Sequence, residues 1–529
     1  MAFAPIVVKT FTPSMLVFAI ISARPREPLM FHLRMLSSEQ FAVLREHFSR
    51  SGFTEQAVRQ RLHIKPEKPL DLVSICTRPS ANRKVADSLD AIIHLFLLGE
   101  ALPVAEAASF FPPVVWEALT QSELILIEVT DAARCLASAA LFPVRGLFSA
   151  ADRWTNIDHS IRPTFADIVY PAMTKSVTQF LDYTSFAPCE DFLELCAGTA
   201  PAALLASKAA KNVWATDITE RSLAFAGFNA ALNGIRNVTF AQGDLFQPVA
   251  GRAFDRIAVH PPYMPVLKPA EIYSAGGALG EDLAKRIISE LPGRLKPGGR
   301  LYCRTLGIDR AKRSYEQTVR DWLGEKHAHY DVALFVLDNL LPRRFALEHT
   351  LNKDGGRAEV AQWEKLFEEN GVEELLAVVL VIQRVAEQRP SFTLRRVMRD
   401  GTPAAAMDWA LGWETAMHRN GTCEALFAAK PVATPGTEVT VRHVVREGQL
   451  AAEDFRMSLK RPFEVDWKVQ PWMPLLLPRC DGDTTVGELF EQSKQNGWVL
   501  PETPATEFCG LIANLISGGF LQTERSQIA

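Results

Sequence analysis

The sequence has few of the features that would place it in a specialised class of protein. Its eight cysteines, at positions 76, 135, 189, 196, 303, 423, 480 and 509, include no C-x-x-C pair among the 529 residues. A zinc site is therefore not expected, and cysteines in apolar surroundings indicate reduced thiols in a cytoplasmic protein. The net charge of −4 excludes a protein whose whole surface binds nucleic acid, although a local basic patch stays possible.

Long apolar runs are also missing. The most apolar early stretch, "PSMLVFAIISA" at 13–23, is too short to span a bilayer, so we expect no membrane association. It resembles a secretory signal only loosely, and globular patterning starts near Met35. We expect residues 1–35 to be a disordered leader.

The length and the patterning together predict several domains. In residues 36–155 a serine-capped stretch, "SSEQFAVLREHFSRSG", begins a series of helices, and a small hairpin follows, which together indicate a winged-helix-like domain. Residues 156–390 form the central domain. Residues 391–529 are an accessory region whose last part again looks winged-helix-like, and the oligomeric state is left open.

The central region alternates strands with helices. Apolar runs such as "DFLELC", "NVWATD", "NVTFAQ", "FDRIAVH" and "GRLYCRTL" have the length of strands, and amphipathic stretches separate most of them. This alternation is typical of an α/β domain with a mainly parallel sheet covered on both faces.

Four consecutive strand ends carry residues suited to a ligand site. "ELCAGTA" (194–200) is a turn of small residues around Gly198, which lets the backbone approach a ligand closely. Asp217 ends the next strand, where a carboxylate suits ribose hydroxyls, and Asp244 after the third suits an exocyclic amine. The fourth strand runs into "AVHPPYMP" (258–265), where prolines end the strand at His260 and fix the backbone.

Each signal has an ordinary explanation when taken alone. Asp217 could cap the following helix, Asp244 could be a turn acid, and the two prolines could only stop a strand. His260 could be a passive histidine at a strand end. Because all four fall in order at the carboxyl ends of consecutive strands, where open α/β sheets bind their ligands, we interpret them together as one site.

Residues 190–305 resemble the class I S-adenosylmethionine-dependent methyltransferases, in particular the methyltransferase-small branch. That branch includes release-factor glutamine methyltransferases and ribosomal-RNA guanine methyltransferases. The resemblance is carried by "DFLELCAGTA", "VWATDITERSLAFAGFNAALNG", "GDLFQPV", "VHPPYMP" and "LKPGGRLY". It implies a Rossmann-like sheet of seven strands, S-adenosylmethionine as the cofactor, and a protein side-chain amide or an RNA base amine as the acceptor.

The resemblance also implies roles for individual residues. The methionine part of the cofactor would lie against Glu194, Cys196, Ala197, Gly198, Thr199 and Ala200. Asp217 and Ile218 would hold the ribose, and Asp244 and Leu245 the adenine, with His260 also near the cofactor. His260, Pro261, Pro262 and Tyr263 would hold the methyl acceptor. A segment at 167–183 lies where relatives place a lid over the cofactor.

Two departures from the family pattern affect these expectations. Cys196 and Ala200 replace glycines of the first motif, and His260 replaces the usual asparagine of the Asn-Pro-Pro-Tyr motif. A neutral imidazole can still accept a hydrogen bond from an amine. It could instead act as a general base on another kind of acceptor atom, so the acceptor atom stays open.

We expect a methyltransferase that acts on a large acceptor, either protein or RNA, because accessory regions flank the central domain. A different class is a non-catalytic winged-helix regulator that binds nucleic acid and retains a cofactor-binding fold. A third class is a nicotinamide dehydrogenase. The sequence lacks the G-x-G-x-x-G motif of that class and has the Pro-Pro-Tyr step, and both observations argue against it.

Overall fold

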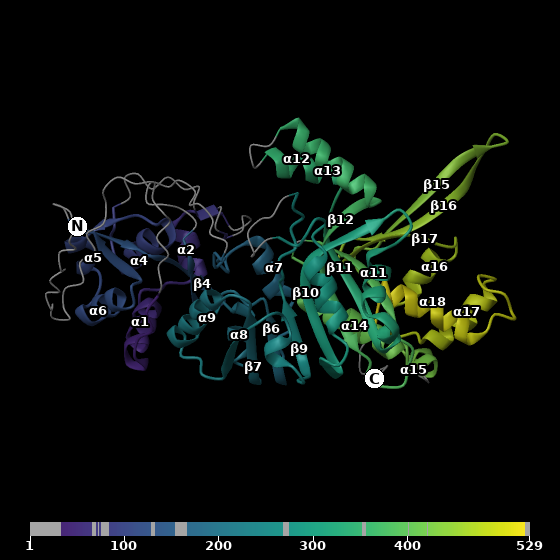
Figure 1. Ribbon diagram of the computed structural model, residues 1–529. Coiled ribbons are helices and arrows are strands. Elements are labelled where there is room, and N and C mark those ends of the chain that lie inside the picture. Colours follow the sequence, from purple (N-terminus) through teal and green to yellow (C-terminus); the bar gives the residue numbers. More distant parts are fainter. Residues whose placement is uncertain are drawn as a thin grey trace, which may run out of the picture. The chain divides into compact units, whose positions relative to one another are not determined.

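The computed structural model describes residues 33–65, 70–71, 74–75, 84–128, 133–153, 167–267, 275–351, 356–399, 401–419 and 422–523 (Figure 1). Most of the expected leader, residues 1–32, lies outside the described residues. The chain divides into two compact units. We call them the N-terminal unit (the described parts of Met1–Thr178, with Gly198–Leu205 and Thr219–Phe240) and the sheet unit (Gln179–Ala197, Ala206–Ile218 and the described parts of Ala241–Ala529).

The N-terminal unit begins with the helix that the serine cap predicted. Ser37 accepts a hydrogen bond from the Gln40 backbone at 3.2 Å, and Gly52 follows the helix with a φ of 70°. The helices are α1 (Ser38–Arg50), α2 (Glu55–Arg61), α4 (Ser88–Ile92), the π-helix Ile93–Leu98, α5 (Val104–Ser109), α6 (Pro113–Gln121), α8 (Pro201–Ala206) and α9 (Glu220–Leu232). The helix α7 (Lys175–Tyr183) crosses the division between the units.

Two hairpins complete this unit. The expected hairpin is present as β2 (Ile125–Glu128) and β3 (Arg134–Ala137), with β1 (Leu102–Pro103) on the other side of β3. The second hairpin pairs β4 (Ala139–Val144) with β5 (Leu147–Asp152). Whether the whole is a winged helix stays a prediction, as do the domain boundaries.

Helix α9 is attached to β5 by two asparagines one turn apart. The Asn229 side chain accepts from the Ala150 N–H at 2.7 Å and donates to the Ala150 carbonyl at 3.0 Å. Asn233 repeats the pattern on Phe148, at 2.9 and 2.7 Å. Each amide thereby satisfies both backbone groups of one strand residue, as a neighbouring strand would.

The sheet unit is built on a mixed sheet. Across the described residues the sheet has eleven strands, in the order β15-β16-β17-β13-β11-β12-β10-β9-β6-β7-β8. The expected count was seven; the four additional strands are β13, β15, β16 and β17, which come from the C-terminal region. The central strands are β6 (Cys189–Leu195), β7 (Ala210–Asp217), β8 (Val238–Gln242), β9 (Phe254–Val259), β10 (Leu295–Arg310), β11 (Tyr330–Leu340) and β12 (Val372–Arg384).

Strands β6, β7, β9 and β10 are parallel and in register. Leu195 lies opposite Thr216 and Val259, and Val259 lies opposite Cys303. An apolar cluster that includes Leu193, Leu195, Ile257, Val259, Leu301 and Cys303 is fully buried along these strands, which accounts for their continuous apolar sequences. Strands β6, β7 and β9 end within one residue of this line, so the residues that follow it there share one edge of the sheet, while β10 continues to Arg310.

The helices of the sheet unit lie in the intervals between strands and in the C-terminal region. They are α10 (Asp282–Glu290), α11 (Tyr315–Trp322), α12 (Pro342–Leu351), α13 (Arg357–Glu369), α14 (Ala404–Met417), α15 (Thr422–Ala428), α16 (Met473–Leu476), α17 (Val486–Gln495) and α18 (Ala505–Ser517). Figure 1 shows α12 and α13 as a hairpin that projects from the strands β11 and β12.

The C-terminal region extends the sheet and adds its own core. The strands β13 (Thr393–Met398), β15 (Glu438–Arg446), β16 (Gln449–Leu459) and β17 (Phe463–Lys468) continue it, and β15 and β16 form a long projecting hairpin (Figure 1). A separate apolar cluster joins α15, α17 and α18. The short strand β18 (Leu521–Gln522) pairs with β14 (Val432–Ala433). The expected winged-helix-like end stays a prediction.

Three negative findings apply to the described residues alone. No helix among them is long and apolar enough to cross a membrane. No group of three His, Cys, Asp or Glu side chains there is arranged to hold a metal ion. The seven cysteines within the described ranges are all free thiols, while Cys76 lies outside them.

Candidate active site

Four residues form a row across the sheet, at the level where β6, β7 and β9 end and β10 continues. Each is the next residue in the chain after a member of the register line formed by Thr216, Leu195, Val259 and Cys303. In the order of the strands β7, β6, β9 and β10 they are Asp217, Cys196, His260 and Arg304. Neighbouring strands are about 4.8 Å apart, so the row extends over roughly 15 Å. The structure therefore brings together three residues that the sequence singled out, and it adds Arg304.

The first motif adopts a strained turn between β6 and α8. Cys196, Gly198 and Ala200 have φ angles of 52°, 53° and 57°, which is the left-handed region that glycine occupies freely. A Cβ added to Gly198 would meet nothing within 4 Å. The turn thus keeps the backbone conformation of a glycine-rich loop although two of its positions carry side chains, and open space borders its middle.

Burial controls the chemistry of the cysteine in this turn. Removal from water raises the pKa of the Cys196 thiol well above its usual range, and the nearby Asp217 carboxylate raises it further. Burial also raises the pKa of Cys303 to about 12. Both thiols are therefore protonated near neutral pH and are poor nucleophiles.

The ends of β7 and β8 are joined by one backbone hydrogen bond and one from the Gln242 side-chain amide. The Asp217 carbonyl accepts from the Gly243 N–H at 2.9 Å, and Gln242 donates to the Ile218 carbonyl at 3.1 Å. The Ile218 side chain is 55% exposed, which is unusual for a large apolar residue. Its position beside Asp217 suits contact with a ligand.

Asp244 lies in the turn after β8. Its carboxylate is paired with Arg286 of α10 at 2.6 Å. Leu245 is buried with a φ of 47°, and its carbonyl accepts a hydrogen bond from Thr216 at 3.3 Å. The Arg286 pairing means that an amine approaching Asp244 would share the carboxylate with a guanidinium, which sequence reasoning did not anticipate.

Strand β9 ends at Val259, one residue before the expected end, because proline has no N–H to donate to a ladder. The Pro-Pro-Tyr step is then held by a second segment. The Gly276 N–H donates to the Met264 carbonyl at 2.9 Å, and a Cβ at Gly276 would come within 2.7 Å of the Tyr263 Cα. A Cβ at Gly280 would come within 2.3 Å of the Tyr263 carbonyl oxygen. These glycines permit a close approach that fixes Tyr263.

His260 contacts two aromatic rings. The Phe180 ring stacks on it with centroids 5.6 Å apart and planes 17° from parallel, and the Tyr263 ring lies 5.5 Å away at 46°. Phe180 belongs to α7, in the segment that the sequence marked as a lid. The Nε2 atom of His260 is buried and has no hydrogen-bond partner among the described residues.

The surroundings of His260 disfavour its charged form. Burial lowers the pKa of the imidazole to about 3, and the positive charge of Arg304 contributes to the lowering. The ring is therefore neutral near pH 7 and is a very weak base. Hydrogen bonding through Nε2 is favoured over general-base catalysis.

Arg304 was missed in the sequence, although a signal was present. It stands in the apolar run "GRLYCRTLGI", where a charged residue interrupts a buried strand. Its guanidinium lies 5.4 Å from the centre of the Tyr263 ring and donates to the Gln179 side chain at 3.2 and 3.4 Å. We call Gln179, Phe180, His260, Tyr263 and Arg304 the His260 cluster.

The remaining expected site residues divide between the units. Glu194 and Ala197 are buried in the sheet unit, where the Ala197 N–H donates to the Thr216 carbonyl at 3.1 Å. Pro261 is buried, and Pro262 is partly exposed. Gly198, Thr199 and Ala200 fall in the N-terminal unit, and the structure describes the backbone conformation of their turn.

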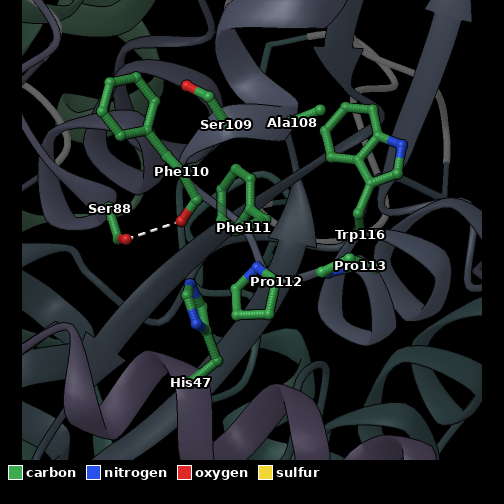
Figure 2. A pocket seen from close by; sticks show the side chains of 9 residues that line it. All are labelled: His47, Ser88, Ala108, Ser109, Phe110, Phe111, Pro112, Pro113 and Trp116. Atoms are coloured by element: carbon green, nitrogen blue, oxygen red, sulfur yellow. Dashed lines mark hydrogen bonds between the residues drawn. The ribbon is translucent and has the colours of Figure 1, made fainter.

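The N-terminal unit has a cavity of its own, which no sequence motif indicated (Figure 2). It measures about 690 Å³, and Phe110, Phe111 and Trp116 line it together with two prolines. His47 approaches Phe111 with ring centroids 5.3 Å apart, and burial lowers the pKa of its imidazole. The Ser88 hydroxyl donates to the Phe110 carbonyl at 2.7 Å and is thereby already engaged within the wall.

Comparisons with known proteins agree with the geometry of the row. Residues 190–371 match the family model described as a methyltransferase domain. A putative protein N5-glutamine methyltransferase of Methanocaldococcus jannaschii is 38% identical over 117 residues, which are 21% of this chain and 58% of that protein. A ribosomal protein uL3 glutamine methyltransferase of Bradyrhizobium diazoefficiens is 35% identical over 127 residues, 22% of this chain and 40% of that protein.

A longer match has lower identity. A release factor glutamine methyltransferase of Gloeobacter violaceus is 27% identical over 206 residues, 34% of this chain and 71% of that protein. Among solved structures, a ribosomal protein L11 methylase from Lactobacillus delbrueckii is 19% identical, with a TM-score of 0.24. The match covers 39% of this chain and 76% of the chain of that structure. Such a TM-score supports no inference about function. The chain spans less than two thirds of the first two curated relatives.

The matched segment identifies a class I methyltransferase domain, whose cofactor is S-adenosylmethionine. Within that class the chain has a domain of the methyltransferase-small branch, as the motif resemblance indicated.

Proposed function

We propose that this protein transfers a methyl group from S-adenosylmethionine to a glutamine side-chain amide of a protein acceptor. The observation that carries the proposal is the row formed by Asp217, Cys196, His260 and Arg304, in which the acid that ends β7 and the motif that follows β9 lie along one register line. The three curated relatives named above have the names of glutamine methyltransferases, one of them putative, and they support an amide acceptor over an RNA base.

The residues present fit the cofactor. The left-handed turn at Cys196, Gly198 and Ala200 keeps the backbone open to a ligand, and an acid ends the adjacent strand. In this proposal the turn faces the methionine part, Asp217 and the exposed Ile218 border the ribose, and Asp244 and Leu245 border the adenine. We further propose that strands β8-β7-β6-β9-β10-β12-β11 form the catalytic sheet.

The His260 cluster would orient the acceptor nitrogen. With the imidazole proton on Nδ1, the buried Nε2 of His260 is a hydrogen-bond acceptor for one amide hydrogen, and the Pro261 carbonyl is suited to accept the other. Two fixed acceptors draw the nitrogen lone pair out of the amide plane, and the Tyr263 ring can stack on the planar group. S-adenosylmethionine, when bound, supplies a methyl group on a cationic sulfur that needs no further activation, so positioning would provide most of the rate.

Calorimetric titration with S-adenosylhomocysteine tests the cofactor site. Wild type should bind, Asp217→Ala should lose the binding, and Asp191→Ala should keep it. Asp191 is a matched control because it is a carboxylate at the opposite end of the neighbouring strand, paired with Lys296 at 2.5 Å. Absence of binding by folded wild type would refute the proposal and favour the non-catalytic regulator.

Labelled methyl transfer tests the acceptor. Purified release factors, ribosomal proteins and ribosomal RNA would be incubated with labelled S-adenosylmethionine, and the products digested and examined by mass spectrometry. Methylglutamine in a protein digest supports the proposal. Label recovered in nucleosides would show an RNA acceptor and would overturn the amide assignment.

A further inference from the structure

Arg304 is a buried cation with no anionic partner in the described parts of the chain. Arg304 is 5% exposed, and its guanidinium contacts neutral groups: the Gln179 amide oxygen, the Thr305 carbonyl at 2.8 Å and the Tyr263 ring. No carboxylate of the described residues lies within ion-pair distance of it. Buried charges are ordinarily paired, because desolvation without a partner is costly.

Two other arginines with buried side chains follow the ordinary pattern. Arg389 is paired with the buried Asp331 at 2.6 Å, and Arg221 is paired with the buried Asp152. The Arg304 guanidinium has five N–H bonds, and the contacts to Gln179 and Thr305 occupy three of them. Both its charge and part of its donor capacity are thus left for a ligand.

The position of Arg304 identifies which ligand is concerned. It follows Cys303, and His260 follows Val259, while Cys303 and Val259 lie opposite each other on neighbouring parallel strands. Arg304 is therefore next to His260 in the row, on the side away from Asp217. Its cation also lies over Tyr263, so it belongs to the part of the site where the acceptor, rather than the ribose, is expected.

Building on the proposed function, we propose that Arg304 is a specificity-determining residue of the acceptor site, which favours a planar carboxamide and excludes ammonium acceptors such as a lysine side chain. The carboxamide carbonyl oxygen would accept from the Arg304 N–H groups while its nitrogen faces His260 Nε2. A cationic acceptor would be repelled by a guanidinium that has no counter-ion.

In the transfer step Arg304 positions the carboxamide and does not activate its nitrogen. The amide nitrogen forms a bond to the methyl carbon as the carbon–sulfur bond breaks, and the electron pair of that bond stays on sulfur. The nitrogen then gives one proton to solvent, since His260 is too weak a base to keep it. As nitrogen electrons are committed to the new bond, Arg304 holds the carbonyl oxygen in the geometry of the neutral amide product.

Two bisubstrate probes separate the possibilities. Both are S-adenosylmethionine analogues in which nitrogen replaces sulfur; one carries an aminoethyl arm, and the other carries the same arm N-acetylated. Calorimetry on the full chain should show that wild type binds the acetylated arm about tenfold more tightly or better. Arg304→Gln should reduce that ratio below about threefold, and Arg304→Lys should retain part of it.

Arg300→Gln is the matched control, because Arg300 lies on the same strand and its guanidinium is paired with Asp408 at 3.0 Å. It should keep the wild-type ratio. Equal binding of the two arms by wild type would overturn the proposal, as would an undiminished ratio in Arg304→Gln. If Arg304→Gln weakens S-adenosylhomocysteine itself tenfold, the cofactor carboxylate is the partner of Arg304, and the proposal is wrong.

If Arg304→Gln does not fold, the test rests on wild type and Arg304→Lys. A preference of wild type for the acetylated arm that Arg304→Lys partly retains supports the proposal, and equal binding of the two arms by wild type overturns it. Failure of the proposed function gives a different result: folded wild type would then bind neither probe nor S-adenosylhomocysteine.

Discussion

The imidazole of His260 and the ring of Phe180 are stacked with centroids 5.6 Å apart and planes 17° from parallel. This contact joins the acceptor motif after β9 to helix α7, which the sequence assigned to a lid. It also buries one face of a histidine that has replaced the usual asparagine.

Removing the stacked ring should impair transfer rather than cofactor binding. Phe180→Ala uncovers one face of His260 and removes a contact of about 1 kcal/mol, so the imidazole is held less firmly. We expect labelled methyl transfer to fall about tenfold while affinity for S-adenosylhomocysteine stays within twofold. Phe186→Ala is the control, since Phe186 stacks on Phe192 at 6.2 Å, before β6 begins. A loss of transfer as large in the control would contradict a special role for Phe180.

His260 should make the fold sensitive to acid. The pKa of His260 is lowered to about 3 in the folded protein, against about 6.5 in the unfolded chain, so between these values the unfolded state binds more protons. Stability from this group is complete above pH 6.5 and is lost as the pH falls toward 3. In denaturant titrations, His260→Asn should lose less stability than wild type between pH 6.5 and 4. Parallel pH curves for the two proteins would show that the imidazole is accessible to water.

Glycine at position 200 should stabilise the protein. Ala200 is buried at a φ of 57°, where a Cβ costs about 1 kcal/mol and glycine has no such cost. Ala200→Gly should therefore raise the free energy of unfolding by roughly that amount. Ala206→Gly, at the last residue of helix α8, should lower it. A destabilised Ala200→Gly would mean that the methyl group contributes more by packing than the backbone conformation costs.

The buried ion pair of the sheet unit should be sensitive to loss of one partner. Asp331 is 0% exposed, accepts from Arg389 at 2.6 Å and from the Phe392 N–H at 3.1 Å, and lies on β11. Asp331→Ala leaves a buried guanidinium without a counter-ion and should cost about 3–5 kcal/mol in thermal or denaturant unfolding. Asp338→Ala, at an exposed position of the same strand, should change stability by less than about 0.5 kcal/mol.

The sequence determined the α/β class of the central region and predicted a candidate site. Continuous apolar strands separated by amphipathic helices indicated the α/β class, and consecutive strand ends marked Asp217, Asp244 and His260, because strand order fixes which residues share an edge. The helix start at Ser37 followed from its local cap, which acts within one turn of chain.

Only the tertiary structure decided which side chains meet at that edge. Arg304 and Phe180 are distant from His260 in the sequence, and the sequence pattern of a strand gives neither its neighbour nor its register. The additional strands β13, β15, β16 and β17 were also not anticipated, because an open sheet edge can accept further strands without any local signal. The neutral state of His260 likewise depends on burial and on the Arg304 charge, which are properties of packing rather than of the motif.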